Sequence, residues 1–283
     1  MSDANEKNQR HAEIEAIELP LLLEAMVQRY GYDFRDYAMA SLKRRIAVAI
    51  QKEPGVMTIS NYQDRILHDP EVMARFLDVV SVGVTSFFRD SDFYKIFREK
   101  VIPTLREIPF IRIWHVGCAT GEEVYSMAIL LHEEGLLDKT RLYATDMNQH
   151  MLDQGRDGIF SVRHLNIYTN NYKEAGGKSE FSDYYTSKHG GVILRSFLTK
   201  NIVWAQHNLV SDSFFNEFQV VLCRNVMIYF NRTLQERVHR LIYNSLAING
   251  VLGLGRGESL RLTTYEHCYE MINRLEKLFR RVQ

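Results

Sequence analysis

The sequence predicts an α/β fold, in which a mostly parallel sheet is covered by helices on both faces and preceded by a small helical domain. Three observations predict this class. Apolar residues recur at helical spacing before residue 109, short apolar strands alternate with helical segments after it, and a glycine-bearing turn at 117–121 joins a strand to a helix. Alternating strands and helices form parallel sheets because each helix returns the chain to the edge where the next strand begins.

The composition is that of a globular protein. Of the 283 residues, 46% are hydrophobic and 25% are charged, which is enough to bury a core. The 35 Lys and Arg residues balance the 35 Asp and Glu residues, so the overall charge favours neither nucleic acid nor direct insertion into an anionic membrane. The polar N-terminus lacks the apolar core of a signal peptide, and no apolar run approaches the length of about 20 residues that spans a bilayer. The three cysteines lack metal-ligand spacing, so we expect reduced thiols, no metal site and a cytoplasmic location.

Residues 1–12 are expected to form a disordered tail, and residues 13–80 an N-terminal helical domain. Within this domain Leu42, Ile46 and Ile50 fall four residues apart, which is the spacing of one helix face. The domain is therefore predicted to be a bundle of three or four helices.

Asp69 and Pro70 mark a helix start, because Asp caps free N–H groups and Pro fits the first helical position. A longer helix follows, and one of its faces is apolar. That face consists of Phe93, Phe97, Val101 and Leu105.

Residues 81–283 are predicted to form the α/β domain. Its expected strands are 111–116, 141–145, 219–223 and 251–254, with helices at 122–134 and 232–247. The stretch from about 163 to 206 breaks the alternation with two Gly-Gly pairs, and we expect a small β insertion there. The last segment, 269–282, fits either a helix or a hairpin.

The turn at 117–121 predicts a nucleotide-type site. Gly117 and Gly121 let the backbone approach a ligand closely, and the helix that follows directs its N-terminus at the pocket. Asp146 ends the next strand, 25 residues after Gly121, where a carboxylate can accept hydrogen bonds from a ribose.

The acidic pair Glu122-Glu123 favours a cationic ligand. The turn lacks the G-x-G-x-x-G fingerprint, and two carboxylates at this place would repel a pyrophosphate. They suit the ammonium and sulfonium groups of S-adenosylmethionine, which argues against NAD. Because one such turn followed by an Asp arises often by chance, a Rossmann-type dehydrogenase stays an alternative on this evidence.

Several blocks, in this order, resemble the chemotaxis receptor methyltransferase (CheR) family over roughly residues 18–283. The most specific block is CRNVMIYF at 223–230. The others are YGYDFRDY at 30–37, SLKRRI at 41–46, TSFFR at 85–89, GEEVYS at 121–126 and ATD at 144–146.

This resemblance implies a Rossmann-like class I S-adenosylmethionine-dependent methyltransferase sheet with a small N-terminal all-α domain and a β-subdomain insertion. It implies transfer of a methyl group to glutamate side chains of methyl-accepting chemotaxis receptors, with S-adenosylhomocysteine as the other product. Together with Gly117 of the turn, the expected cofactor-binding residues are Thr85, Arg89, Glu123, Asp146, Asn208, Leu209, Arg224 and Asn225. Arg89 and Tyr229 are expected to face the transferring methyl group as catalytic residues.

The resemblance also implies partners. Lys43, Arg44 and Arg45 would dock on the acidic cytoplasmic helices of a receptor, although a solvated helix face explains them equally well. The β insertion could bind a receptor's C-terminal tail by strand addition, or simply cover the sheet.

Two departures from the family pattern bear on activity. Gly83 stands where such proteins commonly have Asn, and residues 255–258 are Gly-Arg-Gly-Glu where they usually have Gly-His-Ser-Glu. The departures leave two further alternatives open. One is an S-adenosylmethionine-binding adaptor with weak or no catalysis, and the other is a methyltransferase for a non-receptor protein or a small molecule.

Overall fold

The computed structural model describes residues 2–81, 83, 85–188, 190–213 and 216–283. The chain forms two compact units. A helical unit comprises Met1–Val82 and Tyr229–Leu234, and a sheet unit comprises Gly83–Ile228 and Gln235–Gln283. The first boundary lies close to the predicted one, whereas no local pattern predicts that 229–234 would join the helical unit.

Four helices form the N-terminal part of the helical unit: α1 (Ser2–Tyr30), α2 (Met39–Lys52), α3 (Ile59–His68) and α4 (Pro70–Val80). The expectation of a disordered tail at 1–12 is corrected, because α1 begins at Ser2. These residues include Ala, Glu, Lys, Gln and Arg, which favour helix, and contain neither Gly nor Pro. The predicted cap is confirmed: the Asp69 side chain accepts a hydrogen bond from the Glu71 N–H at 2.9 Å.

The segment 229–234 joins the helical unit through contacts with the loop before α2. Phe230 forms an antiparallel bridge with Tyr37, and their ring centroids lie 5.0 Å apart. The Asn231 side-chain amide donates to the Asp36 carboxylate at 2.9 Å. These contacts explain why a segment so late in the sequence belongs to this unit.

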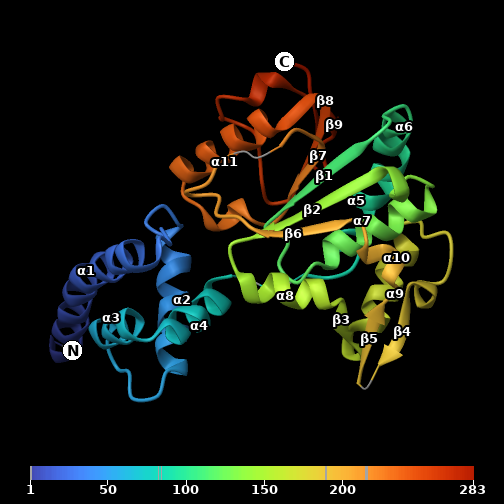
Figure 1. Cartoon of the computed structure of the whole chain (residues 1–283). Coiled ribbons are helices and arrows are strands. Elements are labelled where there is room, and N and C mark those ends of the chain that lie inside the picture. Colours follow the sequence, from blue (N-terminus) through green and yellow to red (C-terminus); the bar gives the residue numbers. More distant parts are fainter. Residues whose placement is uncertain (1, 82, 84, 189, 214–215) are drawn as a thin grey trace. The chain divides into compact units, whose positions relative to one another are not determined.

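The sheet unit contains a seven-stranded sheet of order β6-β2-β1-β7-β8-β10-β9 (Figure 1). The strands are β1 (Ile111–Val116), β2 (Thr140–Asp146), β6 (Ile202–Gln206), β7 (Phe218–Cys223), β8 (Leu246–Leu254), β9 (Tyr269–Asn273) and β10 (Leu278–Arg281). β6, β2, β1, β7 and β8 run parallel, and β10 and β9 are antiparallel. The predicted α/β class is confirmed, and the choice left open for 269–282 is decided in favour of the hairpin.

Helices cover both faces of this sheet, with α5 (Ser91–Ile96) and α7 (Glu122–Glu133) on one face and α11 (Arg232–Ser245) on the other, as right-handed crossovers require (Figure 1). The main covering helices are α7 (Glu122–Glu133), α8 (Gln149–Asp157) and α11 (Arg232–Ser245). Short 3-10 turns lie at Leu137–Lys139, Val162–His164, Phe181–Tyr184, Met227–Tyr229 and Glu266–Cys268.

The long helix expected after residue 90 is divided into α5 (Ser91–Ile96), a π turn η1 (Phe97–Val101) and α6 (Ile102–Leu105). Its predicted apolar face is fully buried. The interruption precedes Pro103, which lacks an N–H and would clash with the carbonyl four residues earlier in a regular helix.

The β insertion is a three-stranded sheet of order β3-β5-β4, with β3 (Ile159–Ser161), β4 (Tyr185–Lys188) and β5 (Gly191–Leu194). It also contains α9 (Leu165–Glu174), and α10 (Ser196–Thr199) follows it. The expected bounds of 163–206 are corrected at both ends. The insertion begins with β3, and β6 belongs to the main sheet, where it pairs with β2.

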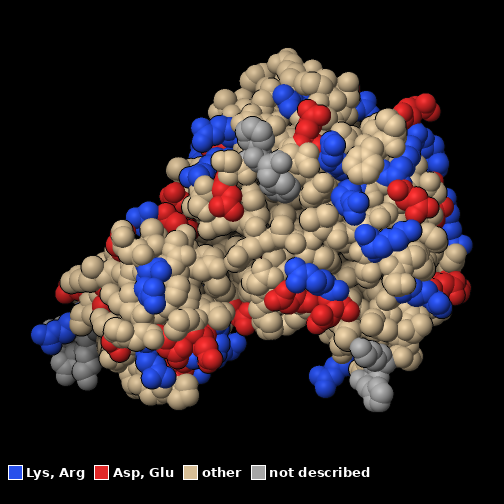
Figure 2. All heavy atoms as spheres, viewed as in Figure 1, with Lys and Arg blue, Asp and Glu red and all other residues tan. Residues whose placement is uncertain are grey.

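Within the residues that the structure describes, none of the helices combines the length and apolar character that crossing a lipid bilayer requires. On the face shown in Figure 2, acidic and basic side chains are interspersed, as the balanced charge would suggest.

Candidate functional site

The carboxyl ends of the parallel strands meet at one edge of the main sheet, where ligands of open α/β sheets bind. β1 runs into the turn at 117–121, β2 ends in Asp146, and β7 is followed by Arg224 and Asn225. Arg89 joins this edge from the loop before α5, because the Arg224 guanidinium donates to its backbone carbonyl at 3.2 Å. The sheet therefore brings together residues that are up to 136 positions apart, from Arg89 to Asn225.

Glycine is required at both ends of the turn. Gly117 has φ +65°, and a Cβ there would lie 2.7 Å from Cγ2 of Val226. Gly121 has φ +90°, and its Cβ would lie 2.5 Å from the ring of Trp204. Both conformations disfavour L side chains, so the turn holds its shape only with glycine.

Asp146 fixes the turn from the end of β2. Its carboxylate accepts the Ala119 N–H and the Asn148 N–H, each at 3.0 Å. Burial raises the pKa of this carboxyl group, and the backbone hydrogen bonds oppose that rise. Because a carboxylate has about four acceptor positions, capacity remains for the hydroxyls of a ribose.

Glu123, in the first turn of α7, is held by two basic side chains. One carboxylate oxygen lies 2.9 Å from Nδ1 of His115, and the other accepts from Nη1 of Arg224 at 3.1 Å. Burial alone would raise the pKa of Glu123, but the His115 hydrogen bond and the Arg224 charge outweigh it and place the pKa below the ordinary value. Glu123 is therefore an anion at neutral pH.

The neighbouring Glu122 differs from Glu123, although the sequence treats the two carboxylates as a pair. Its side chain accepts from the Thr120 hydroxyl at 2.6 Å, and burial raises its pKa. Of these two carboxyl groups, Glu123 has a pKa below the ordinary value and Glu122 has one above it.

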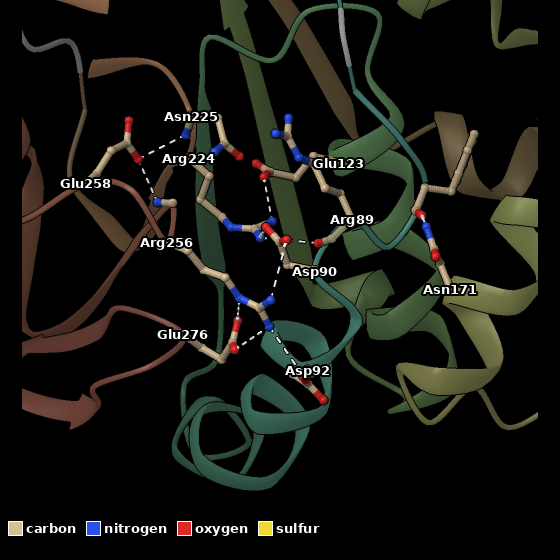
Figure 3. Close-up of polar contacts among 12 residues, drawn as sticks. Arg89, Asp90, Asp92, Glu123, Asn171, Arg224, Asn225, Arg256, Glu258 and Glu276 are labelled. Carbon is tan, nitrogen blue, oxygen red and sulfur yellow. Dashed lines mark hydrogen bonds and ion pairs between the residues drawn. The ribbon is translucent and has the colours of Figure 1, made fainter. Parts of the chain in front are cut away.

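Arg224 is the centre of the polar network drawn in Figure 3. Its side chain is only 2% exposed, donates to Asp90 at 2.9 Å, and lies with Cζ 4.0 Å from the centroid of the Phe93 ring. A guanidinium so deeply buried is stable only because Glu123 and Asp90 compensate its charge. Arg224 thus orients Glu123.

Glu258 holds the loop that follows β7. Its carboxylate accepts four backbone N–H groups, which belong to Asn225, Val226, Met227 and Gly255, at 2.6–2.9 Å. Asn225 has φ +61°, so the loop leaves the strand in an unusual direction that these bonds stabilise.

The remaining predicted residues occupy different places. The half-buried Thr85 donates its backbone N–H to Gly83 at 3.1 Å. Asn208 and Leu209 follow β6 at the same sheet edge, where the Asn208 side chain accepts the Val210 N–H at 3.0 Å. Tyr229 belongs to the helical unit, where the guanidinium of Arg45 lies 4.9 Å from its ring centroid.

Sequence reasoning missed several members of the polar network, among them Asp92 and Glu276. His115 could have been noticed as a polar residue in an otherwise mainly apolar strand, and Asp90 directly follows the block that contains Arg89. Arg256 was noted only as a departure from a family pattern, and no local signal indicates its contacts.

The fold and this acidic, glycine-lined sheet edge define the class of S-adenosylmethionine-dependent methyltransferases. Residues 83–274 match the model of the CheR methyltransferase SAM-binding domain, and residues 17–81 match that of the CheR methyltransferase all-alpha domain. The chain therefore belongs to the CheR methyltransferase family.

Its curated relatives agree with this assignment. The chain is 45% identical to the Pseudomonas putida protein Cher3, over 94% of this chain and 97% of that one. It is 27% identical to the chemotaxis protein methyltransferase of Listeria innocua, over 81% and 85% of the two chains. The chemotaxis protein methyltransferase of Escherichia coli is 26% identical, over 83% of this chain and 82% of that one.

The donor set fits S-adenosylmethionine, the cofactor of this family. An ionised Glu123 suits a cationic group, and Asp146 retains acceptor capacity for a ribose. Among the described residues, no group of three or more His, Cys, Asp and Glu side chains is arranged to hold a metal ion.

Proposed function

We propose that this chain transfers a methyl group from S-adenosylmethionine to glutamate side-chain carboxylates of methyl-accepting chemotaxis receptors, in the adaptation of chemosensory signalling. The products are glutamate methyl esters and S-adenosylhomocysteine. The observation that carries the proposal is the ionised Glu123, held between His115 and Arg224 at the edge of the sheet where Asp146 also lies. The names of the Listeria and Escherichia relatives supply the chemotactic context.

Each predicted cofactor-binding residue receives a role in this proposal. Glu123 pairs with the cofactor's ammonium group, Asp146 accepts from the ribose hydroxyls, and Gly117 allows close approach of the backbone. Arg224 keeps Glu123 ionised and oriented. The remaining residues line the pocket: Thr85, Arg89, Asn208, Leu209 and Asn225.

The chemistry asks little of the protein beyond positioning. The bound cofactor supplies a methyl group already activated on a sulfonium, and a glutamate with a pKa of about 4.3 is already ionised at neutral pH. No general base is therefore needed, and in-line alignment of the reactants can contribute about 7–11 kcal/mol. We assign Arg89 to orient the acceptor carboxylate or the donor's carboxylate end, and Tyr229 to align the acceptor oxygen.

Esterification removes the charge of the acceptor. An arginine that holds the substrate carboxylate therefore holds the neutral product less tightly, which favours product release. Glutamine is neutral and a poor nucleophile, so it should not be methylated.

We propose that Lys43 and Arg44 contribute to receptor docking. Both side chains are exposed on α2, and Lys43 forms a solvent-exposed ion pair with Glu15, at 2.8 Å. Arg45 differs from the expectation, because it is half-buried and donates to the carbonyls of Val79 and Val80 at the end of α4. We therefore propose docking through Lys43 and Arg44, with Arg45 bracing the helix; docking on acidic receptor helices should weaken as salt rises.

A receptor tail could add to the β insertion. β4 forms one edge of the three-stranded sheet, and a strand edge presents backbone groups that can pair with another chain. We propose β4 as the site of strand addition for receptors that carry such a tail.

The test is transfer of label from S-adenosylmethionine to chemoreceptor-rich membranes. Label that base releases as methanol is expected with the wild type. Arg89→Ala should lower kcat/KM about 100-fold, as expected when a positioning group is lost. Arg240→Ala, at an exposed position of α11, is the matched control and should retain activity.

Two results would contradict the proposal. Binding of S-adenosylmethionine without label on any receptor would identify an adaptor. Label on a soluble protein or a small molecule, and none on receptors, would identify another methyl acceptor.

A further inference from the structure

Arg256 lies in the turn after β8, and its guanidinium faces three carboxylates from two other segments (Figure 3). It forms a bidentate pair with Glu276 in the β9–β10 turn, with Nη2···Oε1 at 2.6 Å and Nε···Oε2 at 3.2 Å. At the start of α5, Nη2 lies 3.3 Å from Asp92, and Nη1 lies 4.0 Å from Asp90. Arg256 thus links the C-terminal hairpin to the segment before α5.

Asp90 connects this arginine with the cofactor site. One carboxylate oxygen of Asp90 faces Arg256, and the other accepts from Arg224, which in turn binds Glu123. The chain Arg256–Asp90–Arg224–Glu123 therefore alternates in charge from the surface to the carboxylate assigned to the donor's ammonium group. Asp90 lies between two arginines of this chain. Without the charge of Arg256, Arg224 would be the one arginine of the four residues that still faces Asp90.

We propose that Arg256 is a positioning residue of the cofactor site, which acts through Asp90 to fix Arg224 and hence Glu123. The inference rests on the proposed role of Glu123 in binding the donor.

The choice of arginine has a consequence for pH dependence. Arginine stays charged at every pH at which the protein folds, whereas histidine has an ordinary pKa of about 6.5. The charged groups that face position 256 are Asp90, Asp92 and Glu276, which would raise the pKa of a histidine placed there. In this chain the link to Asp90 therefore persists where a histidine would lose its charge.

The test measures the Kd of S-adenosylhomocysteine, a probe that lacks the sulfonium charge, by calorimetry between pH 6 and pH 9. Arg256→Gln should weaken binding about two- to fivefold at every pH, a modest effect because the Arg256 side chain is 49% exposed. Arg256→His should bind like the wild type at pH 6 and like Arg256→Gln at pH 9. Each value is taken relative to the wild type at the same pH, so that titration of other groups cancels.

Two controls separate positioning from stability. Asp92→Asn removes only the contact to a 70%-exposed carboxylate and should leave the Kd unchanged. Glu276→Gln removes the carboxylate that holds Arg256 to the β9–β10 hairpin. This variant should lower Tm and leave the Kd close to the wild-type value.

Three outcomes would overturn the inference: an Arg256→Gln variant that loses Tm but keeps the wild-type Kd, tighter binding by that variant, or an Arg256→His variant without pH dependence. Failure of the wild type itself to bind S-adenosylhomocysteine would instead refute the proposed function.

Discussion

The Glu258 carboxylate offers the sharpest test of how the loop after β7 is held. The side chain is buried, and its two oxygens accept four backbone N–H groups: Oε2 from Asn225 and Gly255, and Oε1 from Val226 and Met227. Glu258→Gln keeps the shape of the side chain but replaces one acceptor oxygen with an NH₂ donor. Two of the four N–H groups then face a donor in a buried place.

The magnitude follows from these two lost acceptors. A buried donor left unsatisfied costs about 1–3 kcal/mol, so the pair costs about 2–6 kcal/mol. Burial raises the pKa of Glu258, which shows that the ionised side chain is partly penalised, and glutamine avoids that penalty. We therefore expect the free energy of unfolding to fall by about 2–4 kcal/mol, in the lower part of the range.

Urea denaturation at pH 7.5, followed by tryptophan fluorescence, measures this loss. Glu266→Gln is the matched control, because the exposed Glu266 accepts the Leu262 N–H at 2.8 Å in an open turn, and its change should stay within about 0.5 kcal/mol. A Glu258→Gln variant as stable as this control would refute the argument that the carboxylate holds the loop.

Three further changes probe other parts of the chain. Gly117→Ala places a Cβ 2.7 Å from Cγ2 of Val226 at φ +65°, so calorimetry should show stability reduced by about 1–3 kcal/mol and S-adenosylhomocysteine binding weakened. Burial lowers the pKa of His239 to about 4, so the unfolded state binds the extra proton below pH 6.5, and the wild type should lose about 2 kcal/mol of unfolding free energy from pH 7.5 to 5. In urea titrations at pH 7.5 and pH 5, His239→Gln should lose about 2 kcal/mol less unfolding free energy between the two pH values than the wild type. An equal loss in the variant and the wild type would show that His239 is not the group responsible. Glu53→Gln breaks the bidentate pair with Arg75, at 2.6 and 3.0 Å, and should lower the urea midpoint of the helical unit by an amount equivalent to about 1.5–3 kcal/mol.

Much of the fold could be predicted because its signals are local. A run of apolar residues that ends in Gly117 specifies both a strand and the turn after it, and the Asp69-Pro70 pair specifies a helix start. β6 (Ile202–Gln206) was included in the insertion because the Gly-Gly pairs that mark the break in alternation do not show where the insertion ends. What places β6 in the main sheet is its pairing with β2, which the local pattern does not contain.

The division into units depends on contacts that no local pattern reveals. Asn231 and Asp36 are 195 positions apart, yet their side chains form one of the bonds that bring 229–234 to the helical unit. The CRNVMIYF block suggested one continuous part of a methyltransferase domain. The unit boundary instead falls between Ile228 and Tyr229, within that block.

The candidate site shows the same limit in its electrostatics. The resemblance names Arg224 and Glu123 as pocket residues, and from sequence each would be expected to face the ligand. In the structure they also form an ion pair with each other, because burying either charge alone would cost far more than burying the pair. Asp90 and Arg256 then extend the pair by alternating charge from other segments. The charge state of Glu123 is therefore set by residues whose role the local sequence does not reveal. Replacing Arg224 should raise the pKa of Glu123, because the Arg224 charge helps to lower it.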